Sequence, residues 1–262
     1  MRKKFGQNFL INPAVRQTLV DALDAPNGSE VWEIGPGLGA MTAILLEKGL
    51  KVKAFEIDAG FIKILKREFE RENNFCLVEG DVLKTWKSRA VKREAEYLFG
   101  NLPYNIASAF LADLIEGGCL FKRMVVTVQK EVALRMTASV GSPDYSSFSV
   151  LCASAYKVKP LTVIRPSSFF PQPNVDSMAV MLENRNAPAV VPVFFPLLRA
   201  LFSSRRKTIK NNLSVFCASR FGNSALSARF LQENAINSSQ RAEELTPEIF
   251  LSLAKSIDNV RL

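Results

Sequence analysis

Histidine is absent from this sequence, which removes the side chain that most often acts as a general base near neutral pH. A histidine-dependent catalytic triad or metal centre is therefore excluded. The only cysteines lie far apart and form no CxxC pair: Cys76, Cys119, Cys152 and Cys217. This spacing argues against a zinc site or a disulfide framework and is typical of a reducing compartment. From this spacing and the lack of histidine we expect a cytoplasmic protein without a bound metal. Because no uncharged apolar run is long enough to span a bilayer, we also expect it to be soluble.

Acidic residues are too few to balance the basic ones, and the formal net charge is +9 over 262 residues. Such a charge favours an acidic partner, with nucleic acid as the first candidate and an anionic membrane surface as the second. A basic enzyme without either partner would have the same composition. The length is sufficient for one large domain and one small domain.

Short apolar runs of strand type alternate with amphipathic helical segments over the first two thirds of the chain. Strands are expected at Glu30–Ile34, Lys51–Glu56, Phe75–Glu79, 97–99 and 123–128, and helices at 41–48, 61–72 and 107–115. This alternation predicts an α/β fold with a doubly wound, mostly parallel sheet. Residues 150–164 and 177–182 have no long helical segment between them and are expected to form an antiparallel pair at the sheet edge.

A polar stretch ending in proline, residues 183–188, marks the expected domain boundary. We therefore expect one domain over residues 1–183 and a small all-helical domain over residues 189–262. Helices are expected at 193–201, 204–218, 225–232 and 247–257, with Ser224, Ser227 or Thr246 as candidate caps.

The stretch Asn101-Leu102-Pro103-Tyr104 follows the fourth expected strand and suits one specific chemistry. An exocyclic amine is a poor nucleophile because its lone pair is delocalised into the attached π-system. The Asn101 side-chain oxygen and a backbone carbonyl can each accept one N–H of such an amine, while the Tyr104 ring stacks on the base. Pro103 fixes its own φ and stiffens the turn. Asn, Pro and Tyr also suit an ordinary turn at a strand end, so the stretch alone leaves both interpretations open.

A glycine-rich turn, Glu33-Ile34-Gly35-Pro36-Gly37-Leu38-Gly39, follows the first expected strand. Glycines there permit a tight turn and close approach of a nucleotide to the backbone, although Gly35, Gly37 and Ala40 also satisfy a dinucleotide-binding pattern. Glu56 ends the second strand, where a carboxylate can bind ribose hydroxyls. Asp81 follows the third strand, where it can accept a hydrogen bond from an adenine amine. Together with Asn101, these residues form an ordered series along the carboxyl edge of one sheet, where ligands bind in open α/β folds.

In these motifs the sequence resembles the ribosomal RNA adenine N6-dimethyltransferases, which use S-adenosylmethionine and have a Rossmann-like methyltransferase sheet. The resemblance spans nearly the whole chain. Besides the glycine-rich turn, it is carried by Gly6-Gln7-Asn8-Phe9-Leu10, Asn101-Leu102-Pro103-Tyr104-Asn105-Ile106, Phe169-Phe170-Pro171-Gln172-Pro173-Asn174-Val175-Asp176-Ser177 and Phe202-Ser203-Ser204-Arg205-Arg206-Lys207. The glycine-rich turn is common to methyltransferases, whereas the other four motifs together are specific to this family and its close relatives.

The resemblance implies a cofactor pocket lined by Asn8, Leu10, Gly35, Gly37, Glu56, Ile57, Asp81, Val82 and Asn101. Many family members have histidine where this chain has Asn8, which can still hydrogen-bond the methionine carboxylate of the cofactor. In direct methyl transfer to adenine N6, the Asn101 oxygen and the Leu102 carbonyl would orient the amine, and Tyr104 would stack on the base. Phe169 is the candidate for the ring that stacks on the other face of the base. Phe170 is instead expected in the core.

Two basic clusters are candidates for binding RNA phosphates. One begins with Arg2, Lys3 and Lys4 and is followed by Arg16, and the other contains Arg199, Arg205, Arg206, Lys207 and Lys210. A run of charge is more often a solvated helix face, but both clusters lie in segments of family resemblance. Single-stranded or loop RNA is the expected substrate, because side chains cannot read the major groove of A-form RNA.

The resemblance implies dimethylation of two adjacent adenosines near the 3′ end of small-subunit ribosomal RNA, by a protein that binds a small-subunit precursor. Three alternatives stay open. The first is the erythromycin-resistance type, which methylates an adenosine of large-subunit RNA. The second is an assembly or transcription factor of the same fold without catalysis. The third is a nicotinamide oxidoreductase, which would leave the Asn101-Leu102-Pro103-Tyr104 motif unused. No long apolar seam is present, and we expect a monomer.

Overall fold

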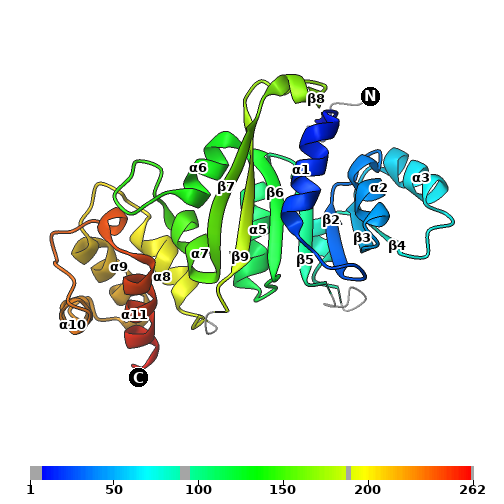
Figure 1. Cartoon of the computed structure of the whole chain (residues 1–262). Coiled ribbons are helices and arrows are strands. Elements are labelled where there is room, and N and C mark those ends of the chain that lie inside the picture. The colour runs from blue at the N-terminus through cyan, green and yellow to red at the C-terminus, as the bar shows by residue number, and fades with distance from the viewer. Residues whose placement is uncertain (1–7, 89–94, 187–189, 261–262) are drawn as a thin grey trace. The chain divides into compact units, whose positions relative to one another are not determined.

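The computed structural model describes residues 8–88, 95–186 and 190–260 (Figure 1). The chain divides into two compact units, one of Met1–Ala133 with Lys157–Asn184 and the other of Leu134–Tyr156 with Arg185–Leu262. The segment Leu134–Tyr156, expected in the first domain, belongs to the second unit. The reason is that α7 (Ser147–Ala155) packs against α8 (Phe194–Leu201) and α11 (Pro247–Asp258).

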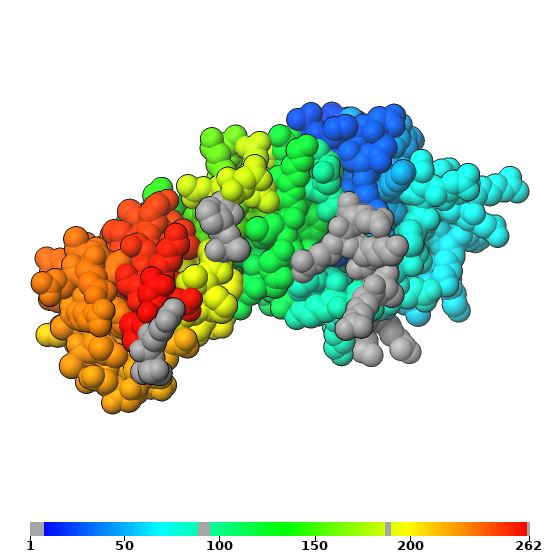
Figure 2. Space-filling model, turned by 90° about the horizontal axis from the view of Figure 1, so that it is seen from below, coloured from blue at the N-terminus to red at the C-terminus, as the bar shows by residue number. Residues whose placement is uncertain are grey.

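The first unit is built on a seven-stranded sheet with the order β4-β3-β2-β5-β6-β9-β7. Its strands are β2 (Glu30–Ile34), β3 (Lys51–Glu56), β4 (Phe75–Glu79), β5 (Tyr97–Asn101), β6 (Arg123–Gln129), β7 (Tyr156–Ile164) and β9 (Ser177–Asn184). Strands β2 to β6 pair in parallel, whereas β9 runs antiparallel to β6. The expected parallel sheet with an antiparallel edge is therefore confirmed. Strand β4 is an edge strand, and the cyan atoms of α3 and β4 form one margin of this unit (Figure 2).

Both faces of this sheet are buried, as the alternation of side chains along its strands requires. Val31 and Phe99 belong to a core cluster that also includes residues of α1 (Pro13–Leu23) and α2 (Ala40–Glu47). The next residue along β2, Trp32, points to the opposite face. There it is fully buried, with its ring packed against Phe55 and Phe121. Helices on both faces explain why these strands are apolar at almost every position.

The remaining helices of the first unit follow individual strands. They are α3 (Ala59–Glu68) after β3, α4 (Val82–Thr85) after β4 and α5 (Ala107–Glu116) after β5. Helix α6 (Lys130–Thr137) follows β6 and continues past Ala133, where the second unit begins. A separate two-stranded sheet pairs β1 (Phe9–Leu10) with β8 (Phe169–Phe170) in antiparallel fashion. This small sheet brings the start of the described chain beside β8 (Figure 1). The 3-10 turn Pro166–Ser168 precedes β8.

The expectation of one strand over residues 150–164 was wrong in its first half. Residues Ser147–Ala155 form α7, and strand β7 begins only at Tyr156. Ser146 and Ser149 form a capping box that starts this helix. A short apolar run does not by itself distinguish a buried strand from a buried helix, so the cap decides.

The second unit contains helices α7, α8, α9 (Ile209–Phe221), α10 (Leu226–Glu233) and α11. Helix α9 starts five residues later than expected, because the Thr208 side chain caps it by accepting a hydrogen bond from the Asn211 amide. Thr246 is the N-cap of α11, whereas α10 is preceded by Ala225 and not by a serine cap. In the described part of the chain, no helix is long and apolar enough to cross a membrane.

Candidate cofactor and adenine pocket

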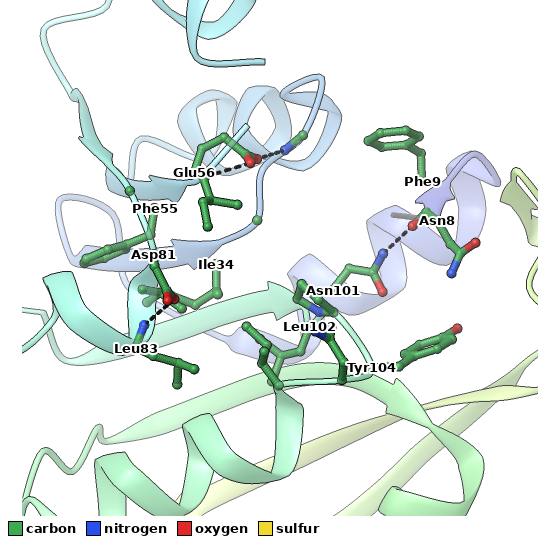
Figure 3. Close-up of a pocket in the computed structure, with 18 residues that line it drawn as sticks. Asn8, Phe9, Ile34, Phe55, Glu56, Asp81, Leu83, Asn101, Leu102 and Tyr104 are labelled. Carbon is green, nitrogen blue, oxygen red and sulfur yellow. Dashed lines mark hydrogen bonds between the residues drawn. The ribbon is translucent and has the colours of Figure 1, made fainter. Parts of the chain in front are cut away.

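A pocket of about 270 Å³ opens at the carboxyl edge of the parallel strands (Figure 3). Each of four neighbouring strands supplies residues from the turn that follows it. The lining residues are Asn8, Phe9, Ile34, Gly35, Gly37, Phe55, Glu56, Ile57, Gly80, Asp81, Val82, Leu83, Asn101, Leu102, Pro103, Tyr104, Asn105 and Ile106. The structure thus brings together the glycine turn, both acidic residues and the Asn-Leu-Pro-Tyr stretch.

Glu56, the last residue of β3, is only 3 % exposed. Its carboxylate accepts hydrogen bonds from the backbone amides of Gly37, Ile57 and Asp58 at 3.1, 2.9 and 2.9 Å. Burial raises the pKa of Glu56, and these amides oppose the rise by stabilising the charge. The amides therefore hold the carboxylate in one orientation in the pocket wall.

Gly37 lies so close to Phe9 that no other residue fits without displacing the ring. Its φ of 58° is in the left-handed region, and a Cβ there would lie 2.6 Å from Cε1 of Phe9. The Phe9 ring is itself packed edge-on against Phe61 of α3, at 5.4 Å between centroids. The glycine turn is therefore a backbone surface in the pocket wall, as a nucleotide-binding turn requires.

Asn101 is the last residue of β5. The nitrogen of its side-chain amide is hydrogen-bonded, whereas the oxygen has no partner among the described residues. Its Nδ2 donates to the Asn8 carbonyl at 2.7 Å, which fixes which way the amide faces, because a carbonyl can only accept (Figure 3). Its Oδ1 is buried and has no hydrogen-bond partner within the described chain. A buried oxygen of this kind is costly unless a ligand supplies the donor. This orphaned acceptor fits the predicted contact with an N–H of an amine.

The residues after Asn101 are held from two sides. The Leu102 amide donates to the Thr127 carbonyl of β6 at 3.0 Å, which ties the turn to the sheet. The Tyr104 hydroxyl lies 2.5 Å from the Ser177 hydroxyl, at the start of β9. Burial raises the pKa of Tyr104, and the hydrogen bond with Ser177 acts in the opposite direction. The phenol is therefore neutral at physiological pH.

Asp81 lies at the turn after β4, where its Oδ1 accepts a hydrogen bond from the Leu83 amide at 3.0 Å. This bond uses only one of the two carboxylate oxygens. Asp81 therefore caps the turn with one oxygen and also lines the pocket. The expected position of Asp81 beside Val82 in the pocket agrees with the structure.

Two of the predicted site residues lie outside the pocket. Leu10 and Phe169 are 5 % and 1 % exposed and are part of the core cluster. They are opposite each other in the β1–β8 ladder, and therefore point together to the face turned towards the core. The structure therefore has Phe169, the candidate ring for the other face of the base, buried outside the pocket, whereas Phe170, the residue expected in the core, is exposed.

The predicted phosphate-binding residues divide into two groups. Arg2, Lys3 and Lys4 lie outside the described residues. Arg205, Arg206, Lys207 and Lys210 are all exposed, and the first three lie in the turn between α8 and α9 and not in a helix. Arg205 donates to the Pro143 carbonyl at 3.0 Å, which anchors this turn. No group of three metal-ligating side chains occurs among the described residues.

Several further residues line the pocket without a sequence signal of their own, namely Phe9, Ile34, Phe55, Gly80, Leu83, Asn105 and Ile106. Three of them, Phe9, Ile34 and Phe55, are apolar residues of strands, where periodicity alone does not separate core from pocket. Glu33 on β2 is another residue that the sequence motifs do not single out. Its carboxyl is fully buried and accepts a hydrogen bond from the Thr42 hydroxyl at 2.6 Å. Burial raises the pKa of Glu33 to about 7, despite that hydrogen bond.

A sheet of this order, with a glycine turn, two carboxylates and an Asn-Leu-Pro-Tyr turn at one edge, defines a Rossmann-like methyltransferase. The family model for ribosomal RNA adenine dimethylase matches residues 1–259. The chain belongs to the ribosomal RNA adenine dimethylase family. The family resemblance stated from the motifs is therefore confirmed, and a nicotinamide oxidoreductase is set aside.

Similar proteins agree with this assignment over nearly their full lengths. The ribosomal RNA small subunit methyltransferase A of Treponema denticola is 45 % identical over 266 residues, covering 99 % of this chain and 90 % of that protein. A crystal structure of a dimethyladenosine transferase from Plasmodium falciparum has a TM-score of 0.81 at 28 % identity, covering 95 % of this chain and 97 % of that one. The 23S rRNA methyltransferase ErmE has a TM-score of 0.70 at 21 % identity, covering 96 % of this chain and 100 % of that one, and shares the fold.

Proposed function

We propose that this protein transfers methyl groups from S-adenosylmethionine to N6 of two adjacent adenosines near the 3′ end of small-subunit ribosomal RNA. The product is N6,N6-dimethyladenosine, formed during ribosome assembly. The observation that carries this proposal is the buried, unpartnered Oδ1 of Asn101 beside Tyr104 in the pocket. The family and the small-subunit methyltransferase name of the Treponema denticola relative support the choice of RNA.

The pocket residues fit S-adenosylmethionine. Glu56, held by three backbone amides, has the position and charge to accept hydrogen bonds from ribose hydroxyls. Asp81 would accept from the adenine amine of the cofactor, and Gly35 and Gly37 would leave room for it against the backbone. When bound, the cofactor supplies an electrophilic methyl group on its sulfonium.

The protein's own residues would bind and orient the target base. The Asn101 oxygen and the Leu102 carbonyl would accept the two N–H groups of the adenine amine, which holds the amine in place. The Tyr104 ring, held through Ser177, would stack on the base. No general base is needed before attack, because the nitrogen becomes acidic only once it is methylated. The contribution of these residues is proximity and orientation, which agrees with a chain that has no histidine.

The target adenine must leave its stack to reach a pocket of this kind, so a single-stranded or loop segment suits the site. The exposed cations between α8 and α9 support RNA binding by the second unit. We propose a monomer that acts in the cytoplasm on a small-subunit precursor, without a metal ion.

The deciding experiment is incubation of the purified protein with labelled S-adenosylmethionine and unmethylated small ribosomal subunits, with naked large-subunit RNA in parallel. Nucleoside analysis should find dimethyladenosine only in the small-subunit reaction. Product confined to large-subunit RNA would instead assign the erythromycin-resistance activity. Cofactor binding without product from either substrate would indicate a ribosome assembly or transcription factor that no longer catalyses transfer.

A further inference from the structure

Two consecutive phenylalanines on β8 have opposite environments. Phe169 is 1 % exposed, whereas Phe170 is 59 % exposed and is the only exposed aromatic ring among the described residues. In the antiparallel ladder, Phe170 lies opposite Phe9 and Phe169 lies opposite Leu10. Directly opposed side chains point to the same face of a ladder, and successive ones alternate. Phe170 therefore shares a face with Phe9, whose ring lines the pocket.

The chain that follows Phe170 leads back to the pocket. Residues 171–176 connect β8 to Ser177, whose hydroxyl is bonded to that of Tyr104. One end of this loop is thus fixed beside Phe9 and the other beside Tyr104. Phe9 and Tyr104 lie on two sides of Asn101 in the close-up (Figure 3). Phe170 consequently lies at the rim of the pocket, on the side of the β1–β8 sheet.

Other side chains near this rim suit a nucleic acid strand. Ile11, whose amide extends the β1–β8 ladder by donating to the Ser168 carbonyl, and Val175 in the loop are both exposed apolar residues. Lys130, an exposed cation, lies at the same loop, with its amide bonded to the Asp176 carbonyl and its Nζ 3.5 Å from the Asp176 carboxylate. The loop thus has an exposed ring at one end and a cation at the other, and rings and cations are what single-stranded nucleic acids bind through base stacking and phosphate contacts.

We propose that Phe170 stacks on the nucleotide next to the target adenine, outside the pocket. When one adenosine enters the pocket, its neighbour loses a stacking partner, and an exposed ring at the rim can replace that partner. In a substrate with two adjacent adenosines, the neighbouring nucleotide is the other target. Phe170 would then stack on this second adenosine outside the pocket while Tyr104 stacks on the first one inside it. This inference rests on the proposed function, because it requires that the pocket receives an adenine of RNA.

The test compares three substitutions in the full-length protein acting on unmethylated small subunits. Phe170→Ala and Phe170→Leu should raise KM for the subunit and lower kcat/KM by roughly tenfold or more, because leucine keeps apolar area but has no π-face. Phe170→Trp should stay within about threefold of wild type, because indole stacks at least as well. Affinity for S-adenosylmethionine should be unchanged in all three. Val163→Ala, which shortens an exposed apolar side chain of β7 outside this loop, is the control and should have no effect.

A second measurement reports stacking independently of methyl transfer. A short RNA hairpin with two adjacent loop adenosines, one of them replaced by 2-aminopurine, should show quenched emission on binding to wild type. The quenching should be lost with Phe170→Leu. Full activity and full quenching in the leucine variant would overturn the proposal, as would loss of cofactor affinity in parallel with turnover, since Phe170 would then act on the fold. Absence of any methylated product with wild type would instead overturn the proposed function, while the quenching still decides the stacking.

Discussion

The hydroxyl groups of Tyr104 and Ser177 lie 2.5 Å apart and join the turn after β5 to the start of β9. Because Ser177 is fully buried, its hydroxyl has a fixed position, and the tyrosine ring is held from its far end. A ring that is held in this way loses less conformational entropy when a base stacks on it. We therefore expect Ser177 to position the Tyr104 ring in the proposed adenine site.

Ser177→Ala should lower kcat/KM for RNA by about fivefold, the effect of losing one neutral hydrogen bond of about 1 kcal/mol. Tyr104→Phe should have a similar effect, and the double variant should be no worse than either single one. A double-mutant cycle on methyl transfer measures this coupling, with cofactor affinity as the readout that should not move. Additive losses would show that the two hydroxyls act separately.

Asn101→Ala should reduce methyl transfer by about 10²–10³-fold, the loss that follows removal of one oriented polar group at a reacting centre. Binding of S-adenosylmethionine should stay measurable, because Glu56 and Asp81 are intact. Asn105→Ala is the control, since Asn105 lines the same pocket from the same turn but is exposed. Turnover of Asn101→Ala within a few-fold of wild type would contradict the proposed role of its oxygen.

Gly37→Ala and Gly28→Ala form a matched pair, because both glycines have a left-handed backbone, with φ values of 58° and 82°. Each substitution should lower the free energy of unfolding by roughly 1–2 kcal/mol. Only the alanine at position 37 meets a neighbour, Phe9, whereas nothing lies within 4 Å of the new Cβ at position 28. Calorimetric titration should therefore show at least tenfold weaker cofactor binding for Gly37→Ala alone. Equal affinities for the two variants would show that Phe9 moves aside without consequence.

Glu33 should make the protein less stable as the pH rises. Burial raises its pKa from 4.5 in the reference state to about 7 in the fold, so the folded state holds a proton that the unfolded state releases. The stability from this proton is complete below pH 4.5 and is lost as the pH rises to about 7. The total loss is about 3 kcal/mol, at about 1.4 kcal/mol per pKa unit.

Urea unfolding of Glu33→Gln at pH 5 and pH 8 measures this effect, because glutamine can still accept from Thr42 but does not titrate. The free energy of unfolding of the variant, relative to that of wild type, should be higher at pH 8 than at pH 5. Glu183→Gln is the control, since the hydrogen bond with Arg123 lowers the pKa of Glu183 and leaves it ionised over this range. A difference between wild type and Glu33→Gln that does not change with pH would show that Glu33 is already ionised in the fold.

Arg206 and Lys207 should contribute to RNA affinity through phosphate contacts. Their joint replacement by glutamine should reduce the slope of log affinity against log salt by about one to two units. Arg205 is left intact because its bond to the Pro143 carbonyl anchors the turn. Replacement of Lys63 and Arg71, two exposed cations of the first unit, removes the same charge and should leave the slope unchanged. Equal slopes for both pairs would indicate a general effect of net charge.

The parallel part of the sheet could be predicted from the sequence because each strand carries its own signal. The bounds of β2, β3 and β4 agree with the expected ranges, and their acidic and glycine residues meet at one edge as topology requires. The β8 residues could not be assigned in this way. A strand of two residues has no period, and which phenylalanine faces the core depends on its register with β1, a partner about 160 positions away in the sequence.

The buried Glu33 and the helix α7 were missed for different reasons. Glu33 lies in a glycine-rich motif whose other residues suggest a solvated turn, and its burial follows from the neighbouring strands. In the segment of α7, small polar and apolar residues are mixed and most are buried, so its sequence shows no distinct apolar face. The deciding contacts of Glu33 come from strands distant in the sequence, whereas α7 is decided by its local capping box.

The packing of Trp32 gives this protein a built-in optical probe. Only two tryptophans are present, and the Trp32 indole is buried between Phe121 and Phe55, whose ring also lines the pocket. Its Nε1 has no hydrogen-bond partner among the described residues, so its emission lies at the short-wavelength end of the indole range. With Trp86 replaced by phenylalanine, the remaining fluorescence reports on the centre of the sheet alone. Unfolding and pocket occupancy can then be followed on unlabelled protein, in the same cuvette and without radioactivity.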